Sequence, residues 1–259
     1  MRKLNILGVP IDNVTMQEAM DGIESAVDAR RKEKIFFVNT FYLNVACENS
    51  RYYNVLRKGD HIFGDGSGVR IASKIIRTPI VENVNGTDMI FPLCELCQKR
   101  GFRMFLLGSK PGVVDRLKVW METGYPGIQV CGTHHGYFDR EKDREKILSL
   151  INDSKTDILV VGFSAPLQEL WIDDHADRLT SPVMMGVGGL FDVYAGDIHR
   201  PPAWLRKIGH EWLGRLFQEP KRLWRRYLVG NPQFLARVTL WKYLGIAPRH
   251  IKEAEQDSQ

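Results

Sequence analysis

One carboxylate of the sequence has the surroundings of a catalytic group. Asp65 lies between Gly64 and Gly66, after a short apolar run and before a segment with helical periodicity. Open α/β sheets present reactive groups in this way, at turns where a strand ends and a helix begins. A carboxylate in such a turn can take a proton from a substrate as a general base. The alternative is that Asp65 only caps the helix, because aspartate is a favoured N-cap residue, and the local sequence alone slightly favours this alternative.

Small or polar residues also follow four other predicted strands. These turns are Asn39-Thr40, Gly108-Ser109, Gly162 to Pro166 and Gly186 to Gly189. Because the carboxyl ends of the strands converge on one crevice in a doubly wound sheet, we expect the turns to line a common site. Glycine-rich turns that open helices offer backbone N–H groups and a positive dipole end to phosphate. Together with the Asp65 turn, they favour a nucleotide-type ligand.

Common cofactor and metal motifs are absent from the sequence. No turn has the G-x-G-x-x-G pattern with a following acidic residue, which argues against an NAD(P)-linked oxidoreductase, and there is no Walker A sequence. The chain also lacks D-x-D, the usual carboxylate pair that holds a metal and a sugar nucleotide. The adjacent His134 and His135 do not share a face, so a chelate is not expected. We therefore expect no metal and no cofactor.

The cysteines are typical of a protein that keeps its thiols reduced. Cys94 and Cys97 form a C-x-x-C inside a helical pattern at 87–100, where a redox pair would instead open its helix, so we predict core positions for both. Cys47 and Cys131 lack a nearby ligand set, which argues against zinc. There is no apolar run of 18 or more residues and no signal-peptide pattern after Met1, and these features favour a cytoplasmic protein.

Strands and helices alternate along most of the chain. Strands are predicted at 4–11, 34–38, 61–63, 102–107, 128–131, 157–161 and 182–185. Helices are predicted at 15–29, 40–47, 69–76, 87–100, 113–121, 140–151 and 167–178. This alternation predicts the α/β class, with an open, mainly parallel Rossmann-like sheet covered by helices on both faces. We predict a core at 1–196, a basic helical C-terminal appendage at 197–250 and a disordered tail at 251–259.

Positive charge is concentrated in the predicted appendage. Residues 199–226 hold eight Lys/Arg and two Glu, a net charge of +6, whereas the whole chain carries +5 and the remainder therefore −1. Apolar residues follow helical spacing on one face of this segment: Trp204, Leu205, Ile208, Trp212, Leu213, Leu216 and Phe217, and further along Leu223, Trp224, Tyr227 and Leu228. Basic amphipathic helices with tryptophan at the edge suit an anionic membrane surface.

Two other readings of the basic segment stay open. It could form ordinary surface helices packed on the domain, with solvated arginines. It could also be a nucleic-acid-binding module, although the aromatic residues lie on the opposite helical face from the cations and are not interleaved for base stacking. A gel-shift experiment separates the nucleic-acid reading from the membrane reading.

Taken together, these stretches resemble the WecG/TagA/CpsF glycosyltransferases (glycosyltransferase family 26). The resemblance covers nearly the whole chain, from Leu4 to about Pro232. It rests on a set of motifs in a fixed order: 63–68 (FGDGSG), 84–88 (VNGTD), 107–112 (LGSKPG), 135–138 (HGYF), 161–169 (VGFSAPLQE), 186–196 (GVGGLFDVYAG), and 200–204 (RPPAW) through 219–227 (EPKRLWRRY).

The resemblance implies an inverting transfer of a sugar from a UDP-sugar donor to a polyprenyl-diphosphate-linked sugar acceptor. Members of the family build teichoic acid linkage units, enterobacterial common antigen and exopolysaccharides. The resemblance further implies a cytoplasmic protein that is peripheral on the inner face of the cell membrane, reached through the C-terminal appendage. Its partners would be the two substrates and the anionic membrane surface, with a homo-oligomer possible and no nucleic acid.

Together with the turns described above, the resemblance assigns roles to individual residues. It implies that Asp65 is the general base. It implies a catalytic set of cations against the phosphates: Arg215, Arg222 and Arg225. It implies a substrate pocket with Asn39, Thr40, Asp88 and Gln168. It implies a UDP site with Gly108, Ser109, Tyr137, Gly188 and Asp192. This sequence departs from the frequent family pattern around the pocket, at Phe37, Asn83 and Leu167, so the resemblance does not define the sugars.

Overall fold

The computed structural model describes residues 2–202, 205 and 211–256. The chain forms two compact units, each built from segments that are separate in the sequence. The first unit comprises residues 1–15, 37–85 and 199–259, and the second unit comprises residues 16–36 and 86–198. Almost all of the predicted appendage at 197–250 therefore belongs to the first unit.

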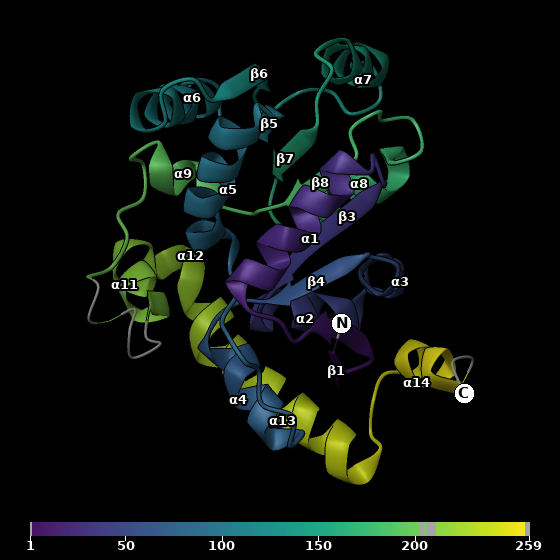
Figure 1. The fold of residues 1–259 in the computed structure, drawn as a ribbon. Helices are drawn as coiled ribbons and strands as arrows, with labels where there is room; N and C mark the ends of the chain where they lie inside the picture. Colours follow the sequence, from purple (N-terminus) through teal and green to yellow (C-terminus); the bar gives the residue numbers. More distant parts are fainter. Residues whose placement is uncertain (1, 203–204, 206–210, 257–259) are drawn as a thin grey trace. The chain divides into compact units, whose positions relative to one another are not determined.

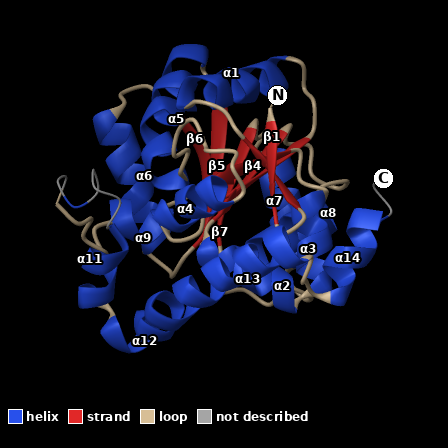
Figure 2. Cartoon of the chain, turned by 90° about the horizontal axis from the view of Figure 1, so that it is seen from below, coloured by secondary structure: helices blue, strands red, loops and turns tan. Residues whose placement is uncertain are grey.

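Eight strands form one mainly parallel sheet (red in Figure 2), which confirms the predicted α/β class. The strands are β1 (Lys3–Ile6), β2 (Val9–Asp12), β3 (Glu33–Val38), β4 (His61–Gly64), β5 (Arg103–Gly108), β6 (Gln129–His134), β7 (Ile158–Gly162) and β8 (Val183–Gly186). Their order is β1-β2-β4-β3-β8-β7-β5-β6. β1 and β2 are antiparallel, whereas β2 is parallel to β4, and β3, β8, β7, β5 and β6 are parallel along their order. β3 belongs to both units, because the division falls between Phe36 and Phe37.

The prediction of one strand over 4–11 is wrong, because this segment is a hairpin. Leu7 and Gly8 join β1 to β2, and both have positive φ, 52° and 79°. A two-residue turn with positive φ at both positions matches the twist of an antiparallel pair. A Cβ at Gly8 would collide with Tyr53, so only glycine fits there. Leucine rarely adopts positive φ. The apolar side chain of Leu7 also continues the apolar pattern of the strand, so the sequence does not indicate a turn at this position.

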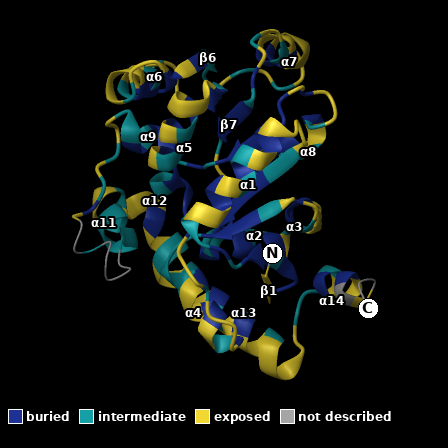
Figure 3. Ribbon diagram, viewed as in Figure 1, coloured by how far each residue is buried: buried dark blue, intermediate teal, exposed yellow. Residues whose placement is uncertain are grey.

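The second unit packs six helices around its strands. They are α1 (Met16–Asp28), α5 (Gly86–Arg100), α6 (Val113–Gly124), α7 (Arg144–Asp153), α8 (Leu167–His175) and α9 (Leu190–Tyr194). α6 packs against β5 and β6, and α1 and α8 pack against β8. β7 and β8 are buried along their whole length (dark blue in Figure 3), as expected for parallel strands covered on both faces.

The helix α7 was predicted to begin at residue 140, but it begins at Arg144. The Asp139 carboxylate accepts hydrogen bonds from the backbone N–H groups of Glu141 and Lys142. The Asp143 carboxylate accepts one from the N–H of Asp139. Such local side-chain-to-backbone bonds compete with helical hydrogen bonding, so the helix begins only at Arg144.

The cysteines of α5 are core residues, as predicted. Cys94 and Cys97 are both fully buried, and burial raises the pKa of the Cys94 thiol to about 12 and that of Cys97 further. Burial also raises the pKa of Cys47 to about 11. These thiols stay protonated at neutral pH, which makes them poor nucleophiles.

The first unit contains the remaining described helices. They are α2 (Thr40–Glu48), α3 (Ser50–Arg57), α4 (Ser67–Ile75), α11 (Glu211–Gln218), α12 (Pro220–Trp224), the π-helical turn η1 (Arg225–Val229), α13 (Gly230–Leu244) and α14 (Arg249–Gln256). α13 packs against α2 and α4 (Figure 1) and buries Phe234 and Val238 completely. α14 runs through residues 251–256, which were predicted as disordered, and buries Ile251.

The predicted apolar face of the basic segment is only partly described. Trp204 and Ile208 lie outside the described residues. In α11 no residue is buried, and Phe217 is 81% exposed. In α12, Leu223 is buried. No helix in the described part of the chain is both long and apolar enough to cross a membrane.

Candidate active site

Asp65 lies at the carboxyl end of β4 in the first unit. Its backbone N–H donates to the carbonyl of Val38 at 2.8 Å, and its side chain is half-buried. The N-cap of α4 is Gly66, one residue later, with φ of +91°. The N–H of Gly66 donates to the Asn83 side chain at 2.6 Å. Asp65 therefore does not occupy the cap position that the alternative interpretation gives it.

Asn39 and Thr40 lie next to this turn at the end of β3. Asn39 is the N-cap of α2, and its Oδ1 accepts from the N–H groups of Phe41 and Tyr42 at 3.0 and 3.3 Å. Thr40 Oγ1 donates to Asn231 Oδ1 of α13 at 2.6 Å. A Cβ at Gly68 would collide with the Thr40 methyl group, so the start of α4 packs directly on Thr40. The structure thus brings the Asp65 turn, Asn39 and Thr40 together.

The three predicted arginines have different surroundings. Arg215 lies 3.9 Å from Glu211 on the same helix. Arg222 makes two hydrogen bonds to Glu219, at 2.9 and 2.5 Å. The guanidinium of Arg225 lies over the ring of Trp224, 5.3 Å from its centroid.

Arg226, which the sequence interpretation missed, has the closest link to the Asp65 cluster. Its guanidinium lies 4.4 Å from the centroid of Phe41, the residue after Thr40. Its Nε is buried and has no hydrogen-bond partner within the described residues. A signal was present in the sequence, because Arg226 follows the apolar Leu223 by three residues and so shares its helical face. The N–H of Gly230 donates to the carbonyl of Arg225 and closes a π-helical turn. Such a turn holds more residues than an α-helical turn, so the regular helical spacing does not continue through this part of the sequence.

In the second unit, Gly108 and Ser109 form a tight turn after β5. The N–H of Ser109 donates to the carbonyl of Gly162 at 3.0 Å, and a Cβ at Gly108 would lie 2.5 Å from the same oxygen, so the turns after β5 and β7 touch. Ser109 Oγ donates to the carboxylate of Asp192 at the start of α9. The N–H of Gly136 donates to the carbonyl of Ser109 at 2.8 Å, which brings Tyr137 next to this turn.

Gln168 has no exposed surface and serves as a strut between two turns. Its Oε1 accepts from the N–H of Ser164 at 3.1 Å and from the N–H of Gly188 at 2.9 Å. Its Nε2 donates to the buried carboxylate of Glu169 at 2.7 Å. The predicted UDP residue Gly188 is therefore held in place by the predicted substrate residue Gln168.

Two predicted residues lie at the margin of this second cluster. Tyr137 is 68% exposed, and its N–H donates to the ring of His135. Asp88 lies in the first turn of α5, where a negative charge stabilises the helix. The link from α5 to the cluster runs through Thr87, whose carbonyl accepts from the hydroxyl of Tyr194 on α9 at 2.7 Å.

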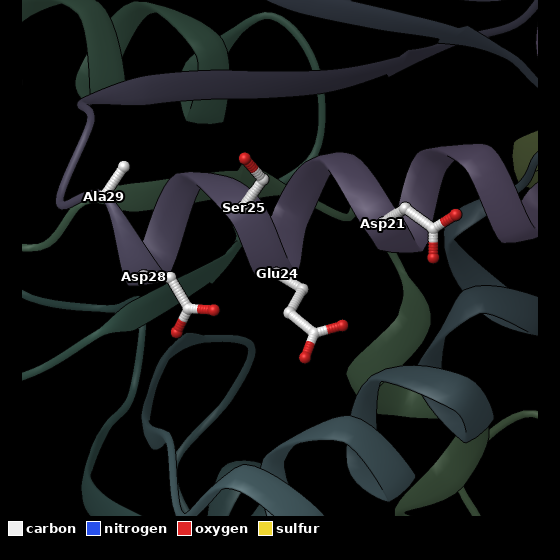
Figure 4. A pocket seen from close by; sticks show the side chains of 5 residues that line it. All are labelled: Asp21, Glu24, Ser25, Asp28 and Ala29. Carbon is white, nitrogen blue, oxygen red and sulfur yellow. The ribbon is translucent and has the colours of Figure 1, made fainter.

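A pocket beside α1 lies outside both clusters. Its lining residues are Asp21, Glu24, Ser25, Asp28 and Ala29 (Figure 4). Arg100 already pairs with Glu24 and Asp28. An acidic lining disfavours phosphate, so this pocket is not the nucleotide site. Across the described ranges, no group of three or more His, Cys, Asp or Glu side chains could hold a metal ion.

The first cluster thus joins the Asp65 turn to Asn39 and Thr40, with Arg226 over the adjacent Phe41, and the second offers glycine-rich turns with a Ser–Asp pair. Both clusters lie at the carboxyl ends of strands of a mainly parallel α/β sheet. The chain belongs to the family described as glycosyl transferase WecG/TagA/CpsF, whose model matches residues 4–247. The predicted resemblance is confirmed.

Relatives from Staphylococcus aureus support the same assignment. The chain is similar to the N-acetylglucosaminyldiphosphoundecaprenol N-acetyl-beta-D-mannosaminyltransferase of strain MW2, with 32% identity over 255 residues, 98% of this chain and 96% of that protein. The enzyme of the same name from strain NCTC 8325 / PS 47 has the same identity and coverage. The one from strain MRSA252 is 31% identical over the same length.

The strut formed by Gln168 leads to a stability prediction. Gln168→Ala should lower the free energy of unfolding by about 2–5 kcal/mol, because the buried N–H of Gly188 and the part-buried N–H of Ser164 lose their acceptor, at up to about 1–3 kcal/mol each. Urea denaturation measures this change. Leu167→Ala is the control, since that side chain is 48% exposed. A Gln168→Ala protein of unchanged stability that no longer binds a sugar substrate would instead assign Gln168 to the substrate pocket.

Proposed function

We propose that this protein is an inverting glycosyltransferase that moves a sugar from a UDP-sugar to a polyprenyl-diphosphate-linked sugar. The observation that carries the proposal is the half-buried Asp65 in the turn between β4 and α4, beside Asn39 and Thr40. The printed names of the relatives suggest the substrates to test first. We propose N-acetylmannosamine as the transferred sugar and a lipid-linked N-acetylglucosaminyl diphosphate as the acceptor.

In the proposed reaction, Asp65 acts as the general base. It takes the proton of an acceptor hydroxyl while that oxygen attacks the anomeric carbon of the donor sugar in line. The new carbon–oxygen bond forms as the bond from the anomeric carbon to the diphosphate oxygen breaks, so UDP leaves with the bonding electrons. A single in-line displacement inverts the anomeric carbon. The Gly66 turn and its bond to Asn83 fix the backbone that carries the base.

The negative charge that develops on the leaving diphosphate needs stabilisation. We assign this role to arginines of the first unit, with Arg226 added to the predicted set of Arg215, Arg222 and Arg225. Arginine suits the role because its planar guanidinium binds phosphate through two parallel hydrogen bonds. Arg226 is supported by its stacking on Phe41 and its buried, unpartnered Nε. A cation held in this way needs little reorganisation when the charge appears.

The second cluster is the proposed UDP site. Gly108, Ser109, Gly188 and Asp192 lie on turns that the Gln168 strut and the Ser109–Asp192 bond hold rigid. We propose that Gln168 positions these turns, while Tyr137 offers an exposed aromatic ring to the nucleotide. Aromatic side chains bind bases by stacking, at about 1–3 kcal/mol per base.

We further propose that the protein is peripheral on the inner face of the cell membrane. The basic segment supports this location, and so do exposed apolar side chains beside it: Leu228 is 55% and Val229 is 54% exposed. Cations near an anionic surface contribute about 1 kcal/mol each, so several are enough for reversible attachment.

The first prediction for this mechanism concerns Asp65. Asp65→Asn should lower the rate of transfer on the order of 10²–10⁴-fold while UDP binding persists, because only the general base is lost. UDP release in the presence of a lipid-linked N-acetylglucosaminyl diphosphate measures the rate. Asp60→Asn, at an exposed carboxylate before the same strand, should keep its activity. An Asp65→Asn protein that melts early yet transfers normally would reduce Asp65 to a structural role.

The second prediction concerns Arg226. Arg226→Gln should lower the turnover number about 10²–10³-fold, the usual loss when one preorganised donor to a developing negative charge is removed. Steady-state kinetics with varied donor measures the change. The control is Arg249→Gln, whose side chain is 92% exposed and paired with Glu253 on α14. Equal turnover in both variants would remove Arg226 from the mechanism.

The third prediction concerns metal ions and rests on the missing D-x-D pair. Transfer should survive an excess of EDTA, because arginines and helix N-termini neutralise the diphosphate in place of a cation. The same assay with EDTA, and then with added Mg²⁺ or Mn²⁺, measures this. Loss of activity with EDTA and recovery with either ion would contradict the proposed charge neutralisation.

A further inference from the structure

Arg140 of the second unit lies on a support of aromatic rings. Its guanidinium carbon is 4.4 Å from the ring centroid of Phe163 and 5.7 Å from that of Phe138. The two rings pack on each other at 6.0 Å, and Phe163 packs edge-on against the buried Trp171 at 5.8 Å. The cation therefore rests on rings that are anchored in the core through α8.

No counter-charge neutralises Arg140 within the described residues. It makes no hydrogen bond or ion pair there. Three carboxylates lie within three residues of Arg140 in the sequence, and none of them pairs with it: Asp139, Glu141 and Asp143. Those of Asp139 and Asp143 accept from backbone N–H groups of their own loop. Partial burial also lowers the pKa of Arg140, which shows that its charge has lost part of its hydration. Arginine stays charged all the same, so its donors are available to an anion.

The support of Arg140 borders the Gly108–Ser109 turn. The link is Gly136, whose N–H donates to the carbonyl of Ser109 at 2.8 Å. A Cβ at Gly136 would lie 2.9 Å from the Phe163 ring and 3.3 Å from the Cα of Gly108. The ring under Arg140 and the turn thus both approach the same side of this glycine.

We propose that Arg140 binds the diphosphate of the nucleotide donor beside the Gly108–Ser109 turn. Stacking covers the face of the guanidinium and leaves the N–H groups at its edge, which bind phosphate oxygens in pairs. The assignment rests on the proposed function in one respect, the identity of the donor as UDP-sugar. The diphosphate of the lipid-linked acceptor has the same chemistry, and the experiment separates the two sources.

The test compares Arg140→Gln and Arg140→Lys with the control Arg144→Gln, an exposed arginine at the start of α7. Dissociation constants for UDP, inorganic pyrophosphate, uridine and a short-chain lipid-linked N-acetylglucosaminyl diphosphate are measured by titration. Arg140→Gln should weaken UDP and pyrophosphate about 10- to 100-fold, the range for a lost charge-assisted pair of hydrogen bonds. Uridine and the lipid-linked probe should bind unchanged. The dissociation constants of Arg140→Lys for UDP and pyrophosphate should lie between those of wild type and Arg140→Gln, because lysine keeps the charge but not the paired hydrogen-bond geometry.

Each other outcome overturns the proposal. Equal UDP affinity in wild type and Arg140→Gln, or a wild type that binds neither UDP nor pyrophosphate, removes Arg140 from any diphosphate site. If Arg140→Gln weakens the binding of uridine as much as that of UDP, Arg140 has a purely structural role. The same follows if Arg140→Lys binds UDP as weakly as Arg140→Gln and also has a lowered melting temperature. Weakened binding of the lipid-linked probe alone assigns Arg140 to the acceptor. The proposed function fails separately, when wild type binds UDP in an Arg140-dependent way but transfers no sugar.

Discussion

The second unit depends on one buried amide. The carbonyl oxygen of Gln168 accepts from two backbone N–H groups, Ser164 and Gly188, that belong to turns after neighbouring strands. A buried N–H without an acceptor is costly, so the Gly188 turn keeps its bond to Gln168, and the part-buried bond to Ser164 ties the second turn to the first. The contact of Gly108 with Gly162 and the bond from Ser109 to Asp192 extend this rigid set. Under the proposed function, these turns need little ordering when a nucleotide binds, which lowers the cost of binding.

In the first unit, the Asp65 turn and Arg226 are held by two different kinds of contact. The glycine turn of Asp65 is held by the N–H of Gly66, which donates to the side-chain oxygen of Asn83, and Arg226 is held by stacking on Phe41. Aromatic stacking orients a guanidinium without consuming its hydrogen-bond donors, unlike the pairing of Arg222 with Glu219. Arg140 in the second unit is held in the same manner. In both units an arginine, Arg226 or Arg140, is thus oriented by an aromatic ring and not by an ion pair with a carboxylate.

The sequence predicts the sheet and the Asp65 turn well, because both are local patterns of glycine and apolar periodicity. It does not predict the β1–β2 hairpin, since Leu7 is an unusual residue at positive φ. The family resemblance implies Gln168 in the substrate pocket, and no sequence pattern predicts that its fully buried side chain accepts from two distant N–H groups. Arg140 is not predicted, because its ring contacts join separate segments of the chain. The spacing of Arg226 from Leu223 indicates a shared helical face but does not identify Phe41 as its partner.

The division of the chain has a consequence for synthesis on the ribosome. The ribosome synthesises α2 and α4 early, and it synthesises α13, which packs against both helices and buries Phe234, on the order of 150 residues later. At translation rates of about 5–20 residues per second, that surface waits roughly ten to thirty seconds for its partner. All segments of the second unit are complete by residue 198. We expect this nascent chain to fold its second unit first and to need protection of an apolar surface until the last helices emerge.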